Sequence, residues 1–337
     1  MKRLVLTIAV ILILIASAGA YMGYRLLFGA NTGDKTTYIY IRQGDGYDHL
    51  LKALKSSGSI VDMRGFELVA KLEKLEGSVR PGRYKIAPGM NNRLLARTFK
   101  LGWQTPINLT ISGNIRDMGK LAAIISSNIE SDSLSVINAL TDGRIIDSLG
   151  FNSYSFPSIF LLNTYEVYWT ISPVDLIKRF KKEYDTFWNS ERTSKAKEIG
   201  LTTLEVCSMA AIVAEESNRK DEYPVMAGVY INRLNEKMLL QADPTVKFAL
   251  NDPSIRRILY KHLEIDSPYN TYMYPGLPPG PIVLPSPEVI DSVLNYTRHK
   301  YLYFCADASL NGSHNFAVTL EEHNRNAREY QRAIGRL

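Results

Sequence analysis

One segment, Leu201–Ser217, constrains the fold of this chain more than any other. Its residues between 206 and 214 are apolar or small, so nearly every side of a helix built from them is hydrophobic. Such a helix belongs in the interior of a domain rather than on a surface. Thr202, with Glu205 three residues later, has the spacing of a capping box and predicts where the helix begins.

The same helix ends in two acidic residues, Glu215 and Glu216. A carboxylate at the C-terminal end of a helix gains nothing from the helix dipole. Apolar surroundings favour the protonated form of a carboxyl group, because burial disfavours the charge. A carboxyl group that keeps its proton near neutral pH serves as a general acid. Two hypotheses follow: one of these residues is a catalytic acid, or both side chains only solvate the end of a core helix.

The N-terminal segment Leu4–Tyr24 contains no charged residue and follows Lys2 and Arg3. About twenty apolar residues are enough for a helix to cross a bilayer, and basic residues ahead of the span favour a cytoplasmic N-terminus. We therefore expect residues 1–30 to form a transmembrane anchor with the start of a linker, and the rest of the chain to lie outside the cytoplasm. The alternative is a cleaved signal peptide, because Ala18–Ala20 has the small residues of a cleavage site.

The composition is that of a soluble globular protein with a single membrane anchor. With 45% hydrophobic and 22% charged residues among 337 positions, the chain is long enough to bury a core in two domains. The net charge of +6 is spread along the chain, and no basic stripe with interleaved aromatic residues indicates nucleic acid as a partner. Five histidines and two cysteines lack the spacing of a zinc site, so we expect neither a metal ion nor a cofactor. Cys207 lies in an apolar helical segment and Cys305 in an apolar segment, Tyr301–Ala306, that is expected to be a strand. Both cysteines are expected to be buried apolar residues, although an oxidising compartment permits a disulfide.

Downstream of the anchor, short β-rich segments alternate with glycine turns and helical patterns. This alternation predicts strand–turn–helix units without the fixed period of a solenoid. The stretch from 126 to 194 is helix-rich, and its aromatic cluster, Phe151–Trp169, suits packing or a substrate groove, of which we favour packing. The chain is therefore expected to be an α+β protein. The predicted strands are Thr37–Arg42, Gly82–Ala87 and Leu109–Ile111, and the predicted helices are Tyr47–Lys55, Arg93–Lys100 and a helix from Ile115 onward.

The C-terminal third contains the densest motifs. Tyr223–Leu234 has an apolar stripe and a proline in its first turn, which predicts a helix. Leu239–Val246 changes from an extended to a helical pattern, with Asp243 as the expected N-cap and Pro244 as the first helical residue. Proline and glycine between 267 and 282 freeze the geometry of a long loop, whose tyrosines and asparagines suit a hydroxyl-rich ligand.

Six motifs in the second half of the chain resemble the endolytic murein transglycosylase family, the YceG-like proteins, and occur in that family's order. Six ordered motifs are far more specific than any one of them. The motifs are Ala211–Ser217 (AIVAEES), Val229–Leu234 (VYINRL), Leu240–Val246 (LQADPTV), Tyr269–Tyr272 (YNTY), Gly276–Ile282 (GLPPGPI) and Tyr301–Phe304 (YLYF).

The resemblance extends towards the N-terminus. It implies that residues 37–103 form a small LysM-like α/β subdomain and residues 104–337 a larger mixed α+β catalytic domain of the YceG type, and the membrane anchor fits the family. Phe156–Trp169 resembles the aromatic segment that precedes the family's catalytic helix. Leu162–Tyr165 is Leu-Asn-Thr-Tyr where the family usually has Pro-Asp-Thr-Tyr, and this departure leaves the role of that turn open.

The resemblance also assigns a catalytic residue. The family's segment is usually Ile-Val-Glu-Lys-Glu, and this chain has Ile-Val-Ala-Glu-Glu at 212–216. Ala214 replaces the first glutamate and Glu216 matches the second, which implies that Glu216 is the catalytic acid/base and that Glu215 occupies the variable basic position. Helical spacing agrees, because Glu216 continues the apolar stripe that includes Met209.

The implied chemistry needs only one such group. In a lytic transglycosylase the protonated glutamate donates to the glycosidic oxygen between MurNAc and GlcNAc. The carboxylate then takes a proton from the MurNAc C6 hydroxyl, which attacks its own anomeric carbon and gives a 1,6-anhydro end. No water enters, so the second carboxylate of an ordinary glycosidase is not required. The resemblance implies cleavage within nascent glycan strands during cell-wall elongation, with peptidoglycan strands, the cytoplasmic membrane and the cell-wall synthesis machinery as partners.

Other polar and aromatic residues in this part of the chain are candidates for binding or orienting the sugar. They are Gln241, Asp243, Tyr269, Asn270, Tyr272 and His314. Asp243 is the nearest candidate for a second carboxylate, but we favour the N-cap role for it. Two further functions stay open: a non-catalytic glycan-binding membrane protein, and a hydrolytic muramidase that uses Asp243 as base or nucleophile.

Overall fold

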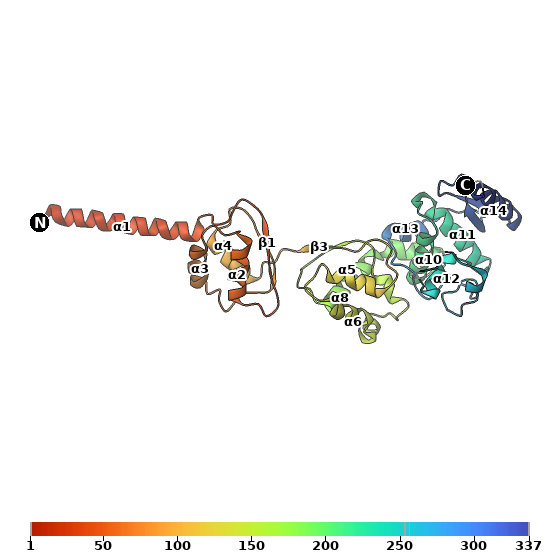
Figure 1. Ribbon diagram of the computed structural model, residues 1–337, viewed down its shortest axis with the longest axis horizontal. Helices are drawn as coiled ribbons and strands as arrows, with labels where there is room; N and C mark the ends of the chain where they lie inside the picture. Colours follow the sequence, from red (N-terminus) through yellow and green to blue (C-terminus); the bar gives the residue numbers. More distant parts are fainter. Residues whose placement is uncertain (1, 253, 256, 336–337) are drawn as a thin grey trace. The chain divides into compact units, whose positions relative to one another are not determined.

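The computed structural model describes residues 2–252, 254–255 and 257–335. Met1, at the start of the predicted anchor, and residues 336–337, at the end of the predicted catalytic domain, lie outside the described residues. The described chain is a mixed α+β protein, as the sequence predicts. Its elements (Figure 1) are α1 (Lys2–Phe28), β1 (Thr37–Ile41), α2 (Tyr47–Ser57), α3 (Met63–Leu72), β2 (Gly82–Ile86), α4 (Asn92–Leu101), β3 (Ile107–Thr110), α5 (Met118–Ser126), α6 (Ser133–Thr141), α7 (Gly143–Ser148), η1 (Phe156–Ile159), β4 (Thr164–Val167), α8 (Pro173–Phe187), α9 (Ser190–Glu198), α10 (Thr203–Glu216), η2 (Lys220–Glu222), α11 (Tyr223–Asn235), α12 (Asp243–Leu250), η3 (Tyr260–His262), α13 (Pro287–Leu294), β5 (Tyr303–Ala306), β6 (His314–Ala317) and α14 (Leu320–Ile334).

The chain divides into two compact units. The first takes in the chain up to Leu109 together with Asn128–Ser131 and Glu166–Ile171, and the second consists of Thr110–Ser127, Asp132–Tyr165 and the chain from Ser172 onward. Every residue that the sequence analysis proposes for the site therefore lies in the second unit.

Helix α1 contains the predicted membrane segment. None of its residues is buried, and an 18-residue window within it has a mean hydropathy of 2.5. Among the described helices it is the one that is long and apolar enough to cross a membrane. Helix α1 therefore fits a single-pass anchor, although a signal sequence has the same length and composition.

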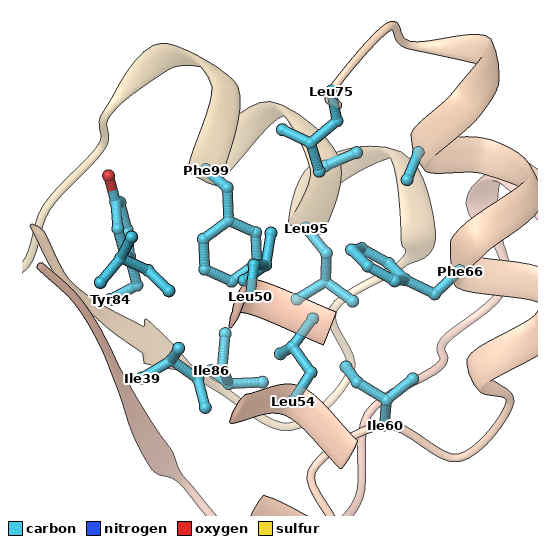
Figure 2. Close-up of a cluster of buried hydrophobic side chains, with 13 residues drawn as sticks. Ile39, Leu50, Leu54, Ile60, Phe66, Leu75, Tyr84, Ile86, Leu95 and Phe99 are labelled. Atoms are coloured by element: carbon cyan, nitrogen blue, oxygen red, sulfur yellow. The ribbon is translucent and has the colours of Figure 1, made fainter. Parts of the chain in front are cut away.

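The first unit has a hydrophobic core of its own. Figure 2 shows side chains from strands β1 and β2 and from helices α2, α3 and α4 converging on one cluster. Five of its side chains are fully buried: Leu50, Leu54, Phe66, Leu95 and Phe99. Burying a leucine or phenylalanine side chain contributes about 1.5–3 kcal/mol. This cluster stabilises helices that are too short to be stable in isolation.

Strands β1 and β2 pair antiparallel, from Thr37 opposite Ile86 to Ile41 opposite Gly82. The segments predicted as separate strand–turn–helix units are therefore partners in one sheet. Helix α3 lies between them in the chain and is not among the predicted helices. Its N-cap is Asp62, whose side chain accepts a hydrogen bond from the first turn.

Helix α10 is central to the second unit. Its residues from 206 to 213 are all buried, and it packs against α11, α12 and α13 (Figure 1). The capping box is confirmed, because Thr202 and Glu205 each accept a hydrogen bond from the other's backbone N–H. Cys207 is fully buried in this helix, Cys305 is partly buried, and both thiols are free. The interior position predicted for the helix is confirmed.

Two predicted elements of the second unit begin later than the sequence suggests. The helix expected from Ile115 begins at Met118, because the Asp117 side chain caps it. The strand expected from Tyr301 begins at Tyr303, because side chains of neighbouring segments engage both the N–H and the carbonyl of Tyr301. In each case hydrogen bonds from side chains decide where regular structure starts.

The aromatic segment before α8 packs as predicted. Phe156, Phe160, Tyr165 and Phe180 contact one another edge-on, with ring centroids between 4.8 and 5.3 Å apart. All four rings are buried. Aromatic pairs of this geometry add stability beyond the area they bury, so these four rings are part of the core of the second unit.

Candidate active site

Glu216 is the last residue of α10 and is partly buried. The hydroxyl of Tyr230, on α11, donates a hydrogen bond of 2.7 Å to its Oε1. The pKa of Glu216 is raised from its ordinary value of 4.5 to about 7, chiefly by burial. The negative charge of Asp243 adds to this rise, whereas the Tyr230 hydrogen bond and the positive charge of Arg233 oppose it. Glu216 therefore keeps a proton available near neutral pH, in the direction predicted from the sequence.

Glu216 borders a pocket of about 330 Å³, here called the Asp243 pocket. Its lining residues are Glu216, Tyr230, Arg233, Leu240, Gln241, Asp243, Tyr272, Tyr303, Phe304, Leu320 and His323. Two carboxyl groups and one guanidinium group thus share a pocket with the rings of three tyrosines and one phenylalanine. Polar groups among aromatic rings are typical of a site that orients a sugar by stacking and hydrogen bonds.

The N-cap role expected for Asp243 is wrong. Ala242 occupies the N-cap position with an extended backbone, and its side chain makes no capping bond. Asp243 is the first helical residue, and its carboxylate accepts a hydrogen bond of 2.5 Å from the Tyr272 hydroxyl. Because the helix starts one residue earlier than predicted, the Asp243 side chain is free to line the pocket rather than to cap the helix.

The loop that carries Tyr272 is held by Asn270. The Asn270 side chain is fully buried, donates to the carbonyl oxygens of Leu263 and Ile265, and accepts from the Tyr272 N–H. Tyr269 is also buried, and its ring packs against a neighbouring phenylalanine. Neither Tyr269 nor Asn270 lines the Asp243 pocket. The structure places both in the support of the loop.

Gln241 lines the pocket with a strained backbone. Its φ is 50°, in the left-handed region that non-glycine residues rarely adopt, and its N–H donates to the Thr271 carbonyl. The Thr271 hydroxyl accepts from the Ala242 N–H and lies 2.9 Å from the Thr245 hydroxyl. This buried network holds the strained conformation. Backbone strain of this kind costs about 1–3 kcal/mol and concentrates at functional sites.

The structure adds three residues that sequence reasoning missed: Tyr230, Arg233 and His323. Arg233 is nine-tenths buried, and its Nε and Nη1 donate to the carbonyl oxygens of Leu302 and Leu240. Among the described residues no carboxylate lies within ion-pair distance of it, so its charge is not neutralised by a salt bridge. For Tyr230 and Arg233 the available signal was their place in a motif shared with the family.

His323, on α14, stacks on Tyr303 with ring centroids 5.5 Å apart. Burial and the nearby Arg233 charge lower the pKa of His323 below its usual 6.5, so the ring is neutral at pH 7. Its buried Nδ1 has no hydrogen-bond partner within the described part of the chain. His323 is therefore a neutral polar residue in the lining of this pocket.

The structure places His314 away from the Asp243 pocket. Its Nδ1 lies 2.7 Å from Glu222 Oε2, and its N–H donates to Glu222 Oε1. The Ser217 hydroxyl also donates to Glu222. His314 is thus part of a carboxylate–imidazole pair beside the end of α10.

Glu215 has a different environment from Glu216. Its carboxylate accepts hydrogen bonds from the side chains of Arg116 and Asn114, and Arg116 also forms a salt bridge with it. The side chain is 10% exposed. Glu215 is thus held in an ion pair and does not line the Asp243 pocket.

Comparisons with known proteins agree with this fold and identify related proteins. The model of the YceG-like family matches residues 39–329. The endolytic murein transglycosylase of Bacillus subtilis (strain 168) is 30% identical over 336 residues, covering 93% of this chain and 90% of the relative. The protein of the same name from Streptococcus pneumoniae serotype 2 (strain D39 / NCTC 7466) is 26% identical over 369 residues, covering 98% of this chain and 65% of the relative.

A solved structure has a similar fold. It is the crystal structure of a putative yceG-like protein from Listeria monocytogenes, which aligns with a TM-score of 0.57 over 87% of this chain and 99% of that chain. The two sequences are 24% identical in this alignment, so the likeness concerns the fold.

Proposed function

Because the chain belongs to the YceG-like family, we propose that it is an endolytic peptidoglycan lytic transglycosylase that cleaves the MurNAc–GlcNAc bond within glycan strands. The observation that carries this proposal is Glu216, a carboxyl group with a pKa of about 7 that borders a polar, aromatic pocket. A group whose pKa lies near the ambient pH populates both its protonated and its ionised form, so it serves as both acid and base. The names of the bacterial relatives support the same reaction class.

The reaction takes place in two proton transfers at Glu216. First, the protonated carboxyl donates to the glycosidic oxygen, so the bond from MurNAc C1 to that oxygen breaks and GlcNAc leaves with a free hydroxyl. Next, the carboxylate takes the proton of the MurNAc C6 hydroxyl while O6 bonds to C1. The product has a 1,6-anhydro end and Glu216 regains its proton, so no water is consumed. Attack within one sugar supplies the high effective molarity of an intramolecular reaction.

Asp243 stabilises the positive charge that develops on the sugar ring in this mechanism. Its carboxylate lies in the same pocket as Glu216, and the Tyr272 hydroxyl orients it. A fixed negative charge near an oxocarbenium-like transition state lowers its energy without entering the covalent chemistry. Tyr230 holds the Glu216 carboxyl in one orientation through its hydrogen bond.

A hydrolytic muramidase is the second candidate, and the position of Asp243 favours it. Asp243 is not the N-cap of α12, and it lines the same pocket as Glu216. Two carboxyl groups flanking one bond are the arrangement of ordinary glycosidases, in which the second activates water or attacks the sugar. In that case Asp243 is the base or nucleophile and Glu216 is the acid.

Mass spectrometry of digested glycan separates these functions. The full chain in detergent is incubated with uncrosslinked glycan strands, and the ends of the products are identified. Anhydro-MurNAc ends, which are lighter than reducing ends by one water, are expected. Reducing ends mean a muramidase, and unchanged polymer means a non-catalytic glycan-binding protein. Asp243→Asn is the matched variant, because it leaves the ends of a lytic reaction unchanged and abolishes a hydrolytic one.

The arrangement of the chain at the membrane is part of the proposal. Residues 1–30 anchor it in the cytoplasmic membrane with the N-terminus in the cytoplasm, which Lys2 and Arg3 favour. Residues 37–103 form a LysM-like subdomain that assists glycan binding, and their hydrophobic core supports a separately packed unit. Residues 104–337 form the catalytic domain, which acts on nascent strands beside the cell-wall synthesis machinery.

Protease added to intact spheroplasts tests the orientation. It should digest the chain beyond the anchor and leave the N-terminal end protected. A mature protein without its first residues, recovered free outside the membrane, would instead identify the segment as a cleaved signal peptide.

A further inference from the structure

Glu216 borders a second pocket, whose lining does not include Asp243. This pocket has a volume of about 390 Å³ and is here called the Leu310 pocket. Of the described residues, Glu216 alone lines both pockets. The other residues that the argument uses are Ser217, Leu310, His314 and Tyr330. The residue that the proposed function makes catalytic therefore lines two pockets.

One wall of the Leu310 pocket is a loop closed by its own hydrogen bonds. The Asp307 N–H donates to the Ser313 carbonyl, the Ser309 N–H to the Asp307 carboxylate, and the Ser313 N–H to the Asn311 side chain. Leu310, at the tip, has a φ of 57° and is 42% exposed. A preshaped loop thus presents an exposed apolar side chain on a strained backbone.

The other walls of the Leu310 pocket are a hydrogen-bonded polar network and an aromatic ring. Ser217 follows Glu216 directly and donates to Glu222, and Glu222 in turn binds the backbone and ring of His314. The side chains of Glu222 and His314 are only 11% and 14% exposed. Tyr330, on α14, adds a partly exposed aromatic ring. The pocket combines a fixed polar network with two apolar surfaces, and sugar rings are recognised by such a combination.

The charges of the two pockets give the cleaved strand a direction. Positive charge develops on the sugar whose anomeric bond breaks, and Asp243 supplies the negative charge that stabilises it. The Asp243 pocket therefore suits MurNAc. We propose that the Leu310 pocket binds the N-acetylglucosamine unit that leaves, with Leu310 and Tyr330 packing on its ring. This inference rests on the proposed function, because it takes Glu216 as the proton donor between the two sugars.

Binding measurements on the full chain in detergent test the inference without catalysis. Glu216→Gln prevents cleavage, and the affinity for fluorescent glycans is measured by anisotropy. One glycan extends beyond the scissile bond on both sides, and the other ends at MurNAc and lacks the leaving sugar. Tyr330→Ala and Leu310→Asn are each added to this variant separately. Asparagine is chosen at position 310 because it tolerates the positive φ of that residue. Arg328→Ala, an exposed position on the same helix as Tyr330, is the matched control.

Tyr330→Ala should weaken binding of the longer glycan about tenfold, as for a truncated anchor residue. Leu310→Asn should weaken it in the same direction, and the control should leave it unchanged. The shorter glycan should bind all variants equally. Equal affinity of every variant for the longer glycan, or equal losses for both glycans, would overturn the inference.

Cleavage of the longer glycan by the unsubstituted chain separates the inference from the proposed function. Cleavage combined with binding that does not depend on Tyr330 refutes the leaving-sugar pocket and leaves the function standing. Binding that depends on Tyr330 without any cleavage supports the pocket and refutes the enzymatic function.

Discussion

Glu215 and Glu216 are adjacent in the chain, yet the structure surrounds them with opposite chemistry. Successive helical residues point about 100° apart, so one side chain reaches Arg116 and Asn114 while the other reaches Tyr230 and the Asp243 pocket. Glu215 has a cationic partner that neutralises its charge. Glu216 has a neutral donor and a neighbouring carboxylate, and burial raises its pKa to about 7. The difference shows that the face of α10, rather than the residue type, separates an ion-paired carboxylate from the carboxyl group that we propose as proton donor.

The largest effect is expected on the rate of cleavage. Glu216→Gln should fold normally and lose about a hundred- to ten-thousand-fold in rate, the range typical of a general acid–base group. Single-turnover cleavage of a defined glycan measures this, because product release then does not mask chemistry. If Glu215→Gln abolished cleavage and Glu216→Gln retained it, the roles assigned to the two residues would have to be exchanged.

Although Glu216→Gln should lose cleavage, it should raise the free energy of unfolding at alkaline pH. Between pH 4.5 and about pH 7 the folded state holds a proton on Glu216 that the unfolded chain has released. Stability from this group is therefore present at low pH and is lost as the pH rises through this window. Glutamine does not ionise, so Glu216→Gln avoids the loss of stability that follows ionisation of the buried carboxyl. The variant should therefore raise the free energy of unfolding at pH 8 by at most about 3 kcal/mol. Denaturant unfolding at pH 4 and pH 8 checks this, and a difference that does not depend on pH would contradict the raised pKa.

Tyr230→Phe should sharpen the account of why the pKa of Glu216 is not higher still. The Tyr230 hydrogen bond stabilises the charged carboxylate and so lowers the pKa. Its removal should move the alkaline limb of the rate–pH profile to higher pH and destabilise the fold by about 1–2 kcal/mol. Tyr303→Phe is the matched control, since Tyr303 lines the same pocket without bonding to Glu216. A limb that moved equally in both variants would show that the effect is not specific to this bond.

The smallest effect is expected at Glu215. Glu215→Gln breaks the ion pair with Arg116 but keeps a polar side chain beside Asn114. Cleavage should stay within about threefold of the unsubstituted chain, while the free energy of unfolding falls by about 1 kcal/mol. A double-mutant cycle with Arg116→Ala isolates the ion pair. A coupling energy of zero would mean that Glu215 owes its position to other contacts.

Sequence reasoning succeeded where a pattern is local. The capping box at Thr202 and the apolar run to Val213 correctly predicted an interior helix, and the same apolar run predicted the direction of the pKa shift at Glu216. The β-rich segments and the helical patterns also located β1, β2, α2 and α4 within a few residues. These features depend on residues that are neighbours in the chain.

The rest depends on contacts between distant segments. Asp243 was expected to cap a helix, but its partner, Tyr272, lies 29 residues away, and capping patterns carry no information about such a partner. Arg233 and His323 enter the pocket from α11 and α14, which only the packing of the second unit brings together. Helix α3 was missed because Gly65 in its first turn lowers its helical propensity, which the buried core overrides.

The titration of the Glu216 side chain tests the central claim most directly. The protein is labelled with ¹³C at the glutamate δ carbon, and the Glu216 signal is assigned by its loss in Glu216→Gln. The account predicts a chemical-shift transition with a midpoint near pH 7, the raised pKa of the buried carboxyl. A midpoint near the ordinary value of 4.5 would mean that Glu216 is ionised at neutral pH and cannot start the reaction.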